Sequence, residues 1–330
     1  MSKLPLTFAC ALYDRAQALY TGDVQAEGID LNFIVIDSPR EIFDRMAGGL
    51  EFGAAEFSSS EFIARMSANK CPFVALPVFM SRVFRHSYIV VNRRSGIKTA
   101  KDLEGKRVGV PLYTQTAAVW LRGILQHEYG VDLSKIHWVQ GAMNVSGSHG
   151  SPKALALLKP VSIEINRTEK SLGKLLEDGE LDATMGSDVP RSLGINPDIV
   201  RLFPNFREIE KEYYKRTRIF PIMHLVAIRR DIYEKHPFVA TSLYKALCKS
   251  REIALARMRY EGALRYMLPW LGADLVELRE VFPGGDPWPY GIEPNRPTIE
   301  ALVTYLAEQH MIAAPMPVED LFVPVSTFDA

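Results

Sequence analysis

Two histidines open similar apolar runs in this sequence. His86 begins HSYIVVNRR (86–94), His224 begins HLVAIRR (224–230), and both runs end in an Arg-Arg pair. Imidazole titrates near neutral pH, so either side chain could donate or accept a proton. If the two runs are equivalent strands that cross between two lobes, both histidines lie near the cleft. We therefore predict that His86 and His224 transfer protons, against the simpler alternative that each is a buried structural residue.

Two arginines precede the first histidine and could hold an anion. Arg82 and Arg85 lie just before His86 and Ser87, and a guanidinium group binds a carboxylate through two parallel hydrogen bonds. We predict that both arginines and Ser87 contact the ligand; the alternative is that the arginines form structural ion pairs. Trp288, in a Pro/Gly-rich loop, could stack on an aromatic ring, although packing is the simpler explanation.

Polar side chains also follow the apolar segments expected to be strands. Tyr13 and Asp14 follow LTFACA, Glu56 and Ser58 end FGAAEFS, and Asp188 follows the similar segment DATMGS. Ligands of open α/β sheets bind at the carboxyl ends of strands. We predict Glu56 and Asp14 as general bases, and Tyr13, Ser58 and Asp188 as binding residues. Ser58 could equally cap the helix that follows.

A second anion site is predicted where the strand KRVGVP meets a helix. Tyr113, Thr114, Gln115 and Thr116 occupy this junction, and a helix N-terminus presents free N–H groups to an anion. Thr114 or Thr116 could instead cap the helix. Arg122 lies inside the same helix and could point into the cleft or pair elsewhere.

The elements that must position these side chains alternate between strand and helix. This rhythm predicts an α/β protein with mainly parallel sheets covered by helices. GGLEFGAAEF (48–57) resembles DGELDATMGSD (178–188), which indicates two similar lobes. We predict a first lobe from residues 1–87 plus 225–330, a second lobe from residues 88–224, a two-strand hinge, and a ligand cleft between the lobes.

Composition excludes several classes of protein. The chain has 330 residues, with 39 Lys+Arg and 39 Asp+Glu, so no net charge attracts nucleic acid or an acidic membrane. Cys10, Cys71 and Cys248 are too few and too scattered for a disulfide framework. We expect a cytoplasmic protein, because the N-terminal apolar stretch is broken before a signal sequence could form and no apolar run could span a membrane.

Cofactor signatures are missing as well. The sequence has no GxGxxG after a strand, no GxxxxGK[ST], no HExxH and no GxSxG, which weighs against nucleotide-binding, zinc-protease and α/β-hydrolase functions. A metal could be assembled from His86, His224, Glu56 and Asp14, but nothing in their spacing requires one. We expect neither a cofactor nor a metal.

Several short motifs together resemble one family. DLEGKRVGVPLYTQTAAVWLRGIL and GELDATMGSDVP look like the second lobe of type II periplasmic binding proteins. YDR (13–15), RHS (85–87), YTQTAAVWLRG (113–123), FPIMH (220–224) and PYGIEPNR (289–296) resemble the 4,5-dihydroxyphthalate decarboxylase family, a cytoplasmic branch of that fold. Residues 144–166 match no motif of that family, so substrate specificity could differ there.

The resemblance implies a cofactor-independent decarboxylation that converts 4,5-dihydroxyphthalate to protocatechuate. The expected partner is then a small anionic aromatic substrate, with no nucleic acid and no membrane; a homo-oligomer is left open. Two alternatives remain at this point: a solute-binding protein that captures an aromatic acid without chemistry, and a different enzyme on the same fold.

Overall fold

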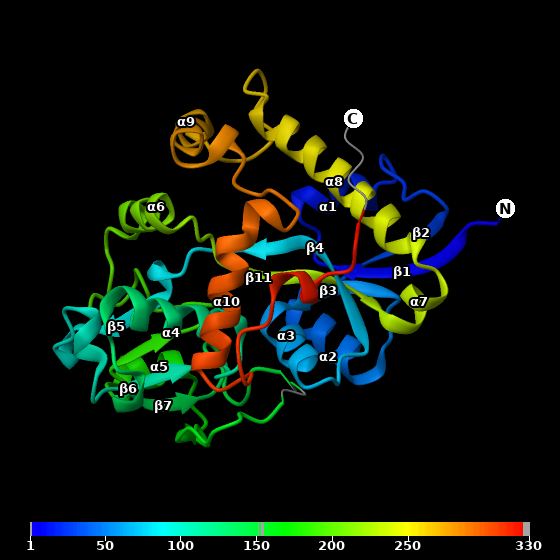
Figure 1. The fold of residues 1–330 in the computed structure, drawn as a ribbon. Coiled ribbons are helices and arrows are strands. Elements are labelled where there is room, and N and C mark those ends of the chain that lie inside the picture. The colour runs from blue at the N-terminus through cyan, green and yellow to red at the C-terminus, as the bar shows by residue number, and fades with distance from the viewer. Residues whose placement is uncertain (1, 151, 153–154, 326–330) are drawn as a thin grey trace.

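The chain forms two lobes, each built around one β-sheet, and they lie side by side (Figure 1). A computed structural model describes residues 2–150, 152 and 155–325. The first sheet has the strand order β2-β1-β3-β11-β4, and the second has the order β10-β5-β9-β6-β7-β8. The chain passes from the first sheet to the second after β4 and returns in β11.

The first sheet is flanked by most of the helices that come from the two ends of the chain. Its strands are β1 (Leu4–Cys10), β2 (Ile29–Val35), β3 (Ala54–Ser58), β4 (Phe73–Arg82) and β11 (Ile222–Arg229). The helices of this part are α1 (Asp14–Tyr20), α2 (Pro39–Gly49), α3 (Ser59–Ser67), α7 (Arg230–Lys235), α8 (Phe238–Arg259) and α10 (Arg296–Glu308).

The second sheet is built from shorter strands. These are β5 (Ile89–Asn92), β6 (Arg107–Val110), β7 (His137–Gln140), β8 (Ile163–Ile165), β9 (Ala183–Met185) and β10 (Ile199–Arg201). Its helices are α4 (Thr116–Tyr129), α5 (Leu172–Asp178) and α6 (Phe206–Thr217). Helix α9 (Leu271–Val281) comes from the C-terminal third but packs on α6, where Arg207 pairs with Asp274 and Lys211 with Glu277.

The two lobes repeat one strand order. The order of the second sheet, reversed and without its edge strand β8, is β7-β6-β9-β5-β10. This order corresponds strand by strand to β2-β1-β3-β11-β4 of the first sheet. Both similarities noted in the sequence therefore fall on equivalent strands: 48–57 with 178–188 at β3 and β9, and 224–230 with 86–94 at β11 and β5. The expectation of a mainly parallel sheet needs one correction, because β11 and β5 each run antiparallel to both of their neighbours.

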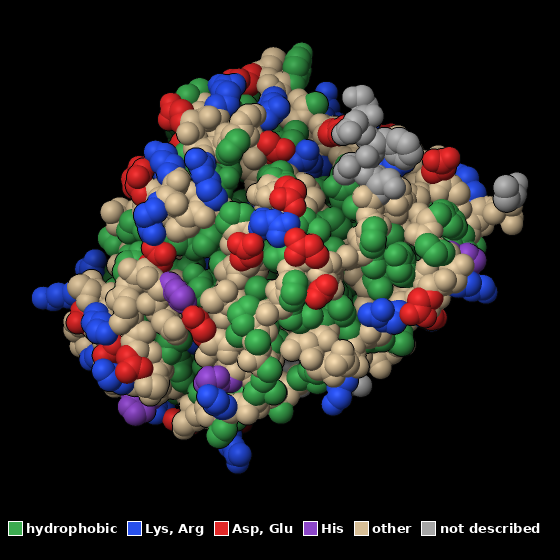
Figure 2. All heavy atoms as spheres, viewed as in Figure 1, with side chains coloured by type: hydrophobic (Ala, Val, Ile, Leu, Met, Phe, Trp, Pro, Cys, Tyr) green, Lys and Arg blue, Asp and Glu red, His purple; other side chains and the backbone are tan. Residues whose placement is uncertain are grey.

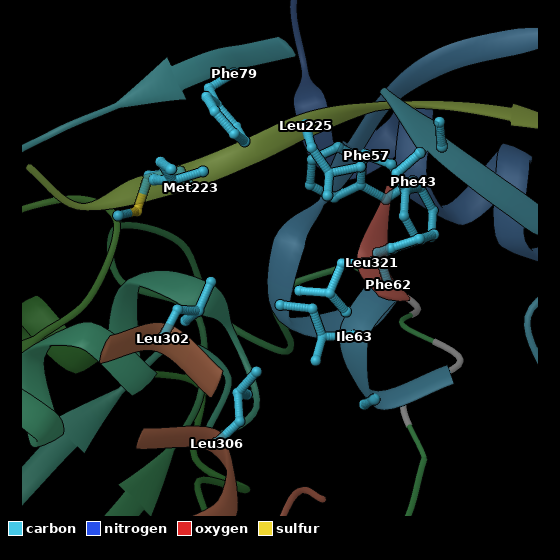
Figure 3. Packing of buried hydrophobic residues seen from close by; sticks show 14 of the residues in the cluster. Phe43, Phe57, Phe62, Ile63, Phe79, Met223, Leu225, Leu302, Leu306 and Leu321 are labelled. Carbon is cyan, nitrogen blue, oxygen red and sulfur yellow. The ribbon is translucent and has the colours of Figure 1, made fainter. Parts of the chain in front are cut away.

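A large apolar core holds the first sheet against α3 and α10. Figure 3 shows Phe57, Met223 and Leu225 from the strands facing Phe62 and Ile63 of α3 and Leu302 and Leu306 of α10. Burial of such side chains contributes about 1.5–3 kcal/mol each. Helix α3 starts as expected from its serines, since the Ser58 hydroxyl accepts a hydrogen bond from the Glu61 amide.

The spacing of apolar residues over 237–267 predicts one continuous helix, but only the first part of this range is helical. Helix α8 ends at Arg259, and the following segment, which contains Gly262 and Pro269, is not helical. The apolar residues of that segment follow a helical spacing, but they lack a surface to pack on: Leu264, Met267, Leu268 and Trp270 are exposed. An amphipathic pattern forms a stable helix only where its apolar face is buried.

The surface carries charges of both signs. In Figure 2, acidic and basic side chains are interspersed over the visible face, and the whole chain has 39 of each kind. None of the helices in the described ranges combines the length and the apolar character needed to cross a membrane.

Helices α4 and α10 pack against each other, and Gly123 lies at their contact because an added methyl group would overlap the Tyr305 ring. We expect Gly123→Ala to lower the free energy of unfolding by about 1–3 kcal/mol through overpacking, measured by denaturant titration. At Gly272 in α9 a methyl group meets only the flexible Glu261 carboxylate, so Gly272→Ala should change stability by less than about 0.5 kcal/mol. Equal effects would show that the α4–α10 contact is looser than described.

Candidate functional site

A cavity of about 360 Å³ lies between the two lobes. We call it the interlobe cavity. This volume suits a small ligand. Its charged, polar and aromatic lining comes from both lobes and comprises Tyr13, Ser38, Arg40, Phe43, Ser58, Glu61, Ser81, Arg85, Tyr88, Thr114, Gln115, Thr116, His149, Ser187 and His224.

The strongest contact at the cavity wall joins His224 to Glu56. His224 lies in β11 and Glu56 in the adjacent strand β3. The Nδ1 atom of His224 lies 2.6 Å from Oε1 of Glu56. Glu56 is 0% exposed, whereas the side chain of His224 is 18% exposed and lines the cavity. With Nδ1 engaged by the carboxylate, Nε2 is the ring atom left to exchange a proton with a ligand.

Glu56 keeps its negative charge although it is buried. Burial alone would raise its pKa, but hydrogen bonds from His224, Tyr13 and the Ala11 amide hold the pKa below its usual range. The Tyr13 hydroxyl donates to Oε1 at 2.7 Å, and the Ala11 N–H donates to Oε2 at 3.2 Å. A positive charge on the His224 ring is therefore compensated by an ionised carboxylate. Burial and the Glu56 charge in turn raise the pKa of Tyr13, which remains a phenol.

The Tyr13 ring packs against Arg15, which also contacts Trp288. The Arg15 guanidinium lies 4.1 Å from the centre of the Tyr13 ring and 4.3 Å from that of Trp288. The Trp288 indole N–H donates to the Phe79 carbonyl at 2.7 Å. Trp288, predicted to stack on a ligand, is not part of the cavity lining. Its half-buried indole packs against the Arg15 guanidinium instead.

Arg85 brings a buried positive charge to the cavity. It is 4% exposed, its NH1 lies 3.5 Å from the Gly186 carbonyl oxygen, and its Nε has no hydrogen-bond partner among the described residues. Burial lowers its pKa to about 10, so the group stays charged at neutral pH. A buried guanidinium with unused donors that faces a cavity is suited to bind a carboxylate.

The N-terminus of α4 supplies polar groups from the second lobe. Thr114, Gln115 and Thr116, predicted to bind an anion, line the cavity. Neither threonine caps the helix, because the N-cap residue is Gln115 and its side chain makes no capping bond. The Thr116 hydroxyl instead lies 3.0 Å from that of Ser58 and 2.9 Å from that of Ser60, so it links the two lobes.

Three of the predicted arginine and tyrosine ligands lie away from the cavity. Arg82 donates to the Asn295 side chain at 2.7 Å and to the Phe220 carbonyl at 2.9 Å. Arg122 donates to the Tyr113 carbonyl at 2.8 Å and lies over that ring. These contacts give both guanidinium groups structural partners and leave Tyr113 buried beneath Arg122.

The structure also separates His86 from His224. His86 is 1% exposed and lies among Tyr129, Phe203 and Tyr213, outside the interlobe cavity. Burial lowers its pKa to about 4. His86 lies two residues farther from its Arg-Arg pair than His224 does, so the two positions are not equivalent.

Ser87, Asp14 and Asp188 are likewise not part of the cavity lining. The Ser87 amide donates to Glu210 at 3.4 Å. Asp14 is exposed and pairs with its neighbour Arg15 at 3.1 Å. Asp188 accepts from Asn144 at 2.8 Å, and the residue just before it, Ser187, is the one that lines the cavity.

Sequence reasoning missed several residues of the cavity: Ser38, Arg40, Tyr88, His149 and Ser187. A signal existed for three of them. Tyr88 lies as far from its Arg-Arg pair as His224 does, Ser187 directly precedes the predicted Asp188, and His149 lies in the stretch 144–166 that matches no family motif. Among the described residues, no group of three or more His, Cys, Asp or Glu side chains could hold a metal ion.

Comparison with known proteins identifies two relatives and one matching family model. The 4,5-dihydroxyphthalate decarboxylase of Comamonas testosteroni is 37% identical over 312 residues, which cover 94% of this chain and 92% of that protein. The protein of the same name from Pseudomonas putida is 38% identical over 190 residues, covering 58% of this chain and 73% of its own length. A family model described as NMT1/THI5 like matches residues 25–159.

Solved structures show the fold. The periplasmic aliphatic sulphonate binding protein of Escherichia coli superposes with a TM-score of 0.56 at 11% identity, covering 97% of this chain and 98% of its own. The alkanesulfonate-binding protein of Xanthomonas axonopodis pv. citri, bound to MOPS, gives 0.51 at 10% identity, with 99% and 100% coverage. The chain therefore has the two-lobed periplasmic-binding-protein fold.

The role of Arg85 can be tested with phthalate as an unreactive dicarboxylate. We expect Arg85→Met to raise the dissociation constant about 10–100-fold, because a charged hydrogen-bonding partner is lost, measured by calorimetry. Arg85→Lys keeps the positive charge but lacks the planar guanidinium group, so its dissociation constant should lie between those of the unmodified protein and Arg85→Met. Arg93→Met removes an exposed arginine outside the cavity lining and should bind like the unmodified protein. Unchanged binding by Arg85→Met would place the anion elsewhere.

Proposed function

Because this chain belongs to the 4,5-dihydroxyphthalate decarboxylase family, we propose that it removes one carboxylate from 4,5-dihydroxyphthalate and releases protocatechuate and carbon dioxide. The relatives carry this activity in their names, and the match extends over nearly the whole chain in one of them. What remains is to derive how the residues of the interlobe cavity could perform the reaction.

The substrate contains the electron source that the reaction needs. Each ring hydroxyl lies para to one carboxylate, so an ionised hydroxyl pushes electrons onto the carbon that bears that carboxylate. A protein acid protonates this carbon. The carbon–carbon bond then breaks, its electrons restore the aromatic ring, and carbon dioxide leaves. The protein must therefore bind a dianion and deliver one proton to a ring carbon.

His224 is suited to deliver that proton. Its Nε2 is free to face the cavity while Glu56 holds Nδ1 at 2.6 Å. The ionised Glu56 carboxylate orients the ring and compensates the positive charge of the protonated form, as the carboxylate does in carboxylate–histidine pairs of other enzymes. Glu56 does not line the cavity, so it acts here as a positioning residue, not as the general base predicted from the sequence.

Arg85 is suited to hold the carboxylate that stays on the ring. Its unused Nε donor and its buried charge favour an anion in the cavity. Phe43, which contacts the His224 ring edge-to-face at 4.8 Å between ring centres, also lines the cavity and offers an apolar wall for an aromatic ring.

The buried Glu56–His224 pair is the observation that favours catalysis over capture alone. Burying a carboxylate costs several kcal/mol of lost hydration, even when it is well paired. A protein that only captures an anion needs a cation such as Arg85. It gains nothing from a buried carboxylate such as Glu56 beneath the cavity wall. A proton donor does need such a charge, because it must carry and release a proton at one fixed place.

The assay that tests this function follows carbon dioxide release from 4,5-dihydroxyphthalate by chelator-treated protein. We expect turnover by the unmodified protein and a loss of about 10²–10⁴-fold in kcat for His224→Gln, the range typical of a removed acid or base, with substrate binding retained. His86→Gln alters the histidine outside the cavity and should keep most of the activity in folded protein. Micromolar binding without turnover would support a solute-binding protein instead, and loss of activity only in His86→Gln would refute the assignment of His224.

A further inference from the structure

The interlobe cavity contains a second imidazole that the mechanism above does not use. His149 lies in the segment after β7, which leaves the second lobe and runs toward α2 and α3 of the first (Figure 1). Its neighbour Gly150 lies against the side chain of Arg40 in α2, since an added methyl group would lie 2.6 Å from the Arg40 Cγ. The half-buried His149 ring thus faces the cavity from a segment that reaches across the cleft.

Hydrogen bonds hold this ring at the N-terminus of α4. The amide nitrogen of Gln115 lies 3.1 Å from Nε2 of His149 and 2.9 Å from the Ser187 hydroxyl. All three side chains line the cavity. One ring nitrogen of His149 is therefore engaged by Gln115, which leaves Nδ1 for another partner.

The orientation of the Gln115 amide decides what Nδ1 can do. As placed, the amide donates to Nε2 and its own oxygen is buried with no hydrogen-bond partner in the described part of the chain. A half-turn of the amide exchanges its two ends, which have nearly the same size and shape. The oxygen then accepts from Nε2–H and from the Ser187 hydroxyl, and Nδ1 becomes a free acceptor.

The surroundings of His149 favour the neutral ring. Burial, and next the positive charge of Arg40, hold its pKa below the usual range, while the more weakly acting charges of Asp44 and Asp188 oppose this shift. A neutral imidazole can accept a proton at neutral pH. The His224 ring has a different neighbour, since Oε1 of Glu56 lies 2.6 Å from its Nδ1.

Other possible bases at the cavity wall are already engaged. Glu61 pairs with Arg65 at 2.9 Å and with Arg40 at 3.5 Å. The Tyr13 hydroxyl donates to Glu56 at 2.7 Å. Apart from His224, which delivers the proton in the proposed reaction, His149 is the described imidazole that lines the cavity and has a ring nitrogen left over.

We propose that His149 contacts a ring hydroxyl of the substrate and takes its proton during decarboxylation, so that it selects hydroxylated phthalates. This inference rests on the proposed function. The hydroxyl proton moves to Nδ1 of His149, and the oxygen electrons form a carbonyl as the para carbon takes a proton from Nε2 of His224. The bond to the carboxylate then breaks and its electrons restore the ring. His149 returns its proton to the phenolate oxygen, and His224 regains one from water.

The contact is tested by binding two ligands that differ only in their hydroxyls. The measurements use the His224→Gln background, in which 4,5-dihydroxyphthalate should not be consumed. Adding His149→Phe should raise the dissociation constant of 4,5-dihydroxyphthalate about tenfold, the equivalent of one hydrogen bond, and leave that of phthalate unchanged. His137→Gln, at an exposed position of β7, is the matched control and should change neither. A loss that is equal for both ligands, or no loss, would overturn the contact.

The role as a base is tested by the pH profile of kcat/KM with His224 intact. In the unmodified protein, activity should fall toward low pH as His149 becomes protonated and can no longer accept a proton. His149→Gln should lower kcat about 10²–10⁴-fold and remove this low-pH limb. A limb that persists in His149→Gln would refute the role. If the unmodified protein does not release carbon dioxide at all, the proposed function fails, while the ligand comparison still decides whether His149 contacts the hydroxyl.

Discussion

The buried negative charge of Glu56 constrains how the strands of the first lobe meet at the cavity wall. Removing a carboxylate from water costs several kcal/mol, and this cost is offset only if the surrounding donors are in place. They come from distant parts of the chain: the segment after β1 supplies Ala11 and Tyr13, and β11 supplies His224. The charge therefore ties together the ends of three neighbouring strands and sets the orientation of the histidine ring at the cavity wall.

The two lobes share a strand order but contribute different chemistry. The first lobe carries the Glu56–His224 pair, whereas the second contributes the hydroxyl, amide and imidazole groups of Ser187, Gln115 and His149. Arg85 lies on the segment that connects the lobes. A ligand between the lobes would contact the His224 imidazole on one side and the groups of Ser187, Gln115 and His149 on the other.

The prediction that polar residues at strand ends meet at the cleft found five of the fifteen polar, charged and aromatic residues that line the cavity. It placed Tyr13, Ser58 and the residues at the start of α4 correctly, because the carboxyl ends of strands in open sheets meet at the cleft. It could not distinguish Arg82 from Arg85. Both precede the same strand, and only the contacts of Arg82 with Asn295 and Phe220 show that one is structural and the other faces the cavity.

The sequence alone determined the fold class, the repeated strand pattern and the residue types available for binding an anion, since periodicity and short motifs are local properties of the chain. The tertiary structure decided which of these side chains meet. His86 and His224 look alike in sequence, yet one packs among aromatic rings and the other lies against a buried carboxylate. The physical reason is that the direction of a side chain depends on the packing of distant elements, which no local pattern records.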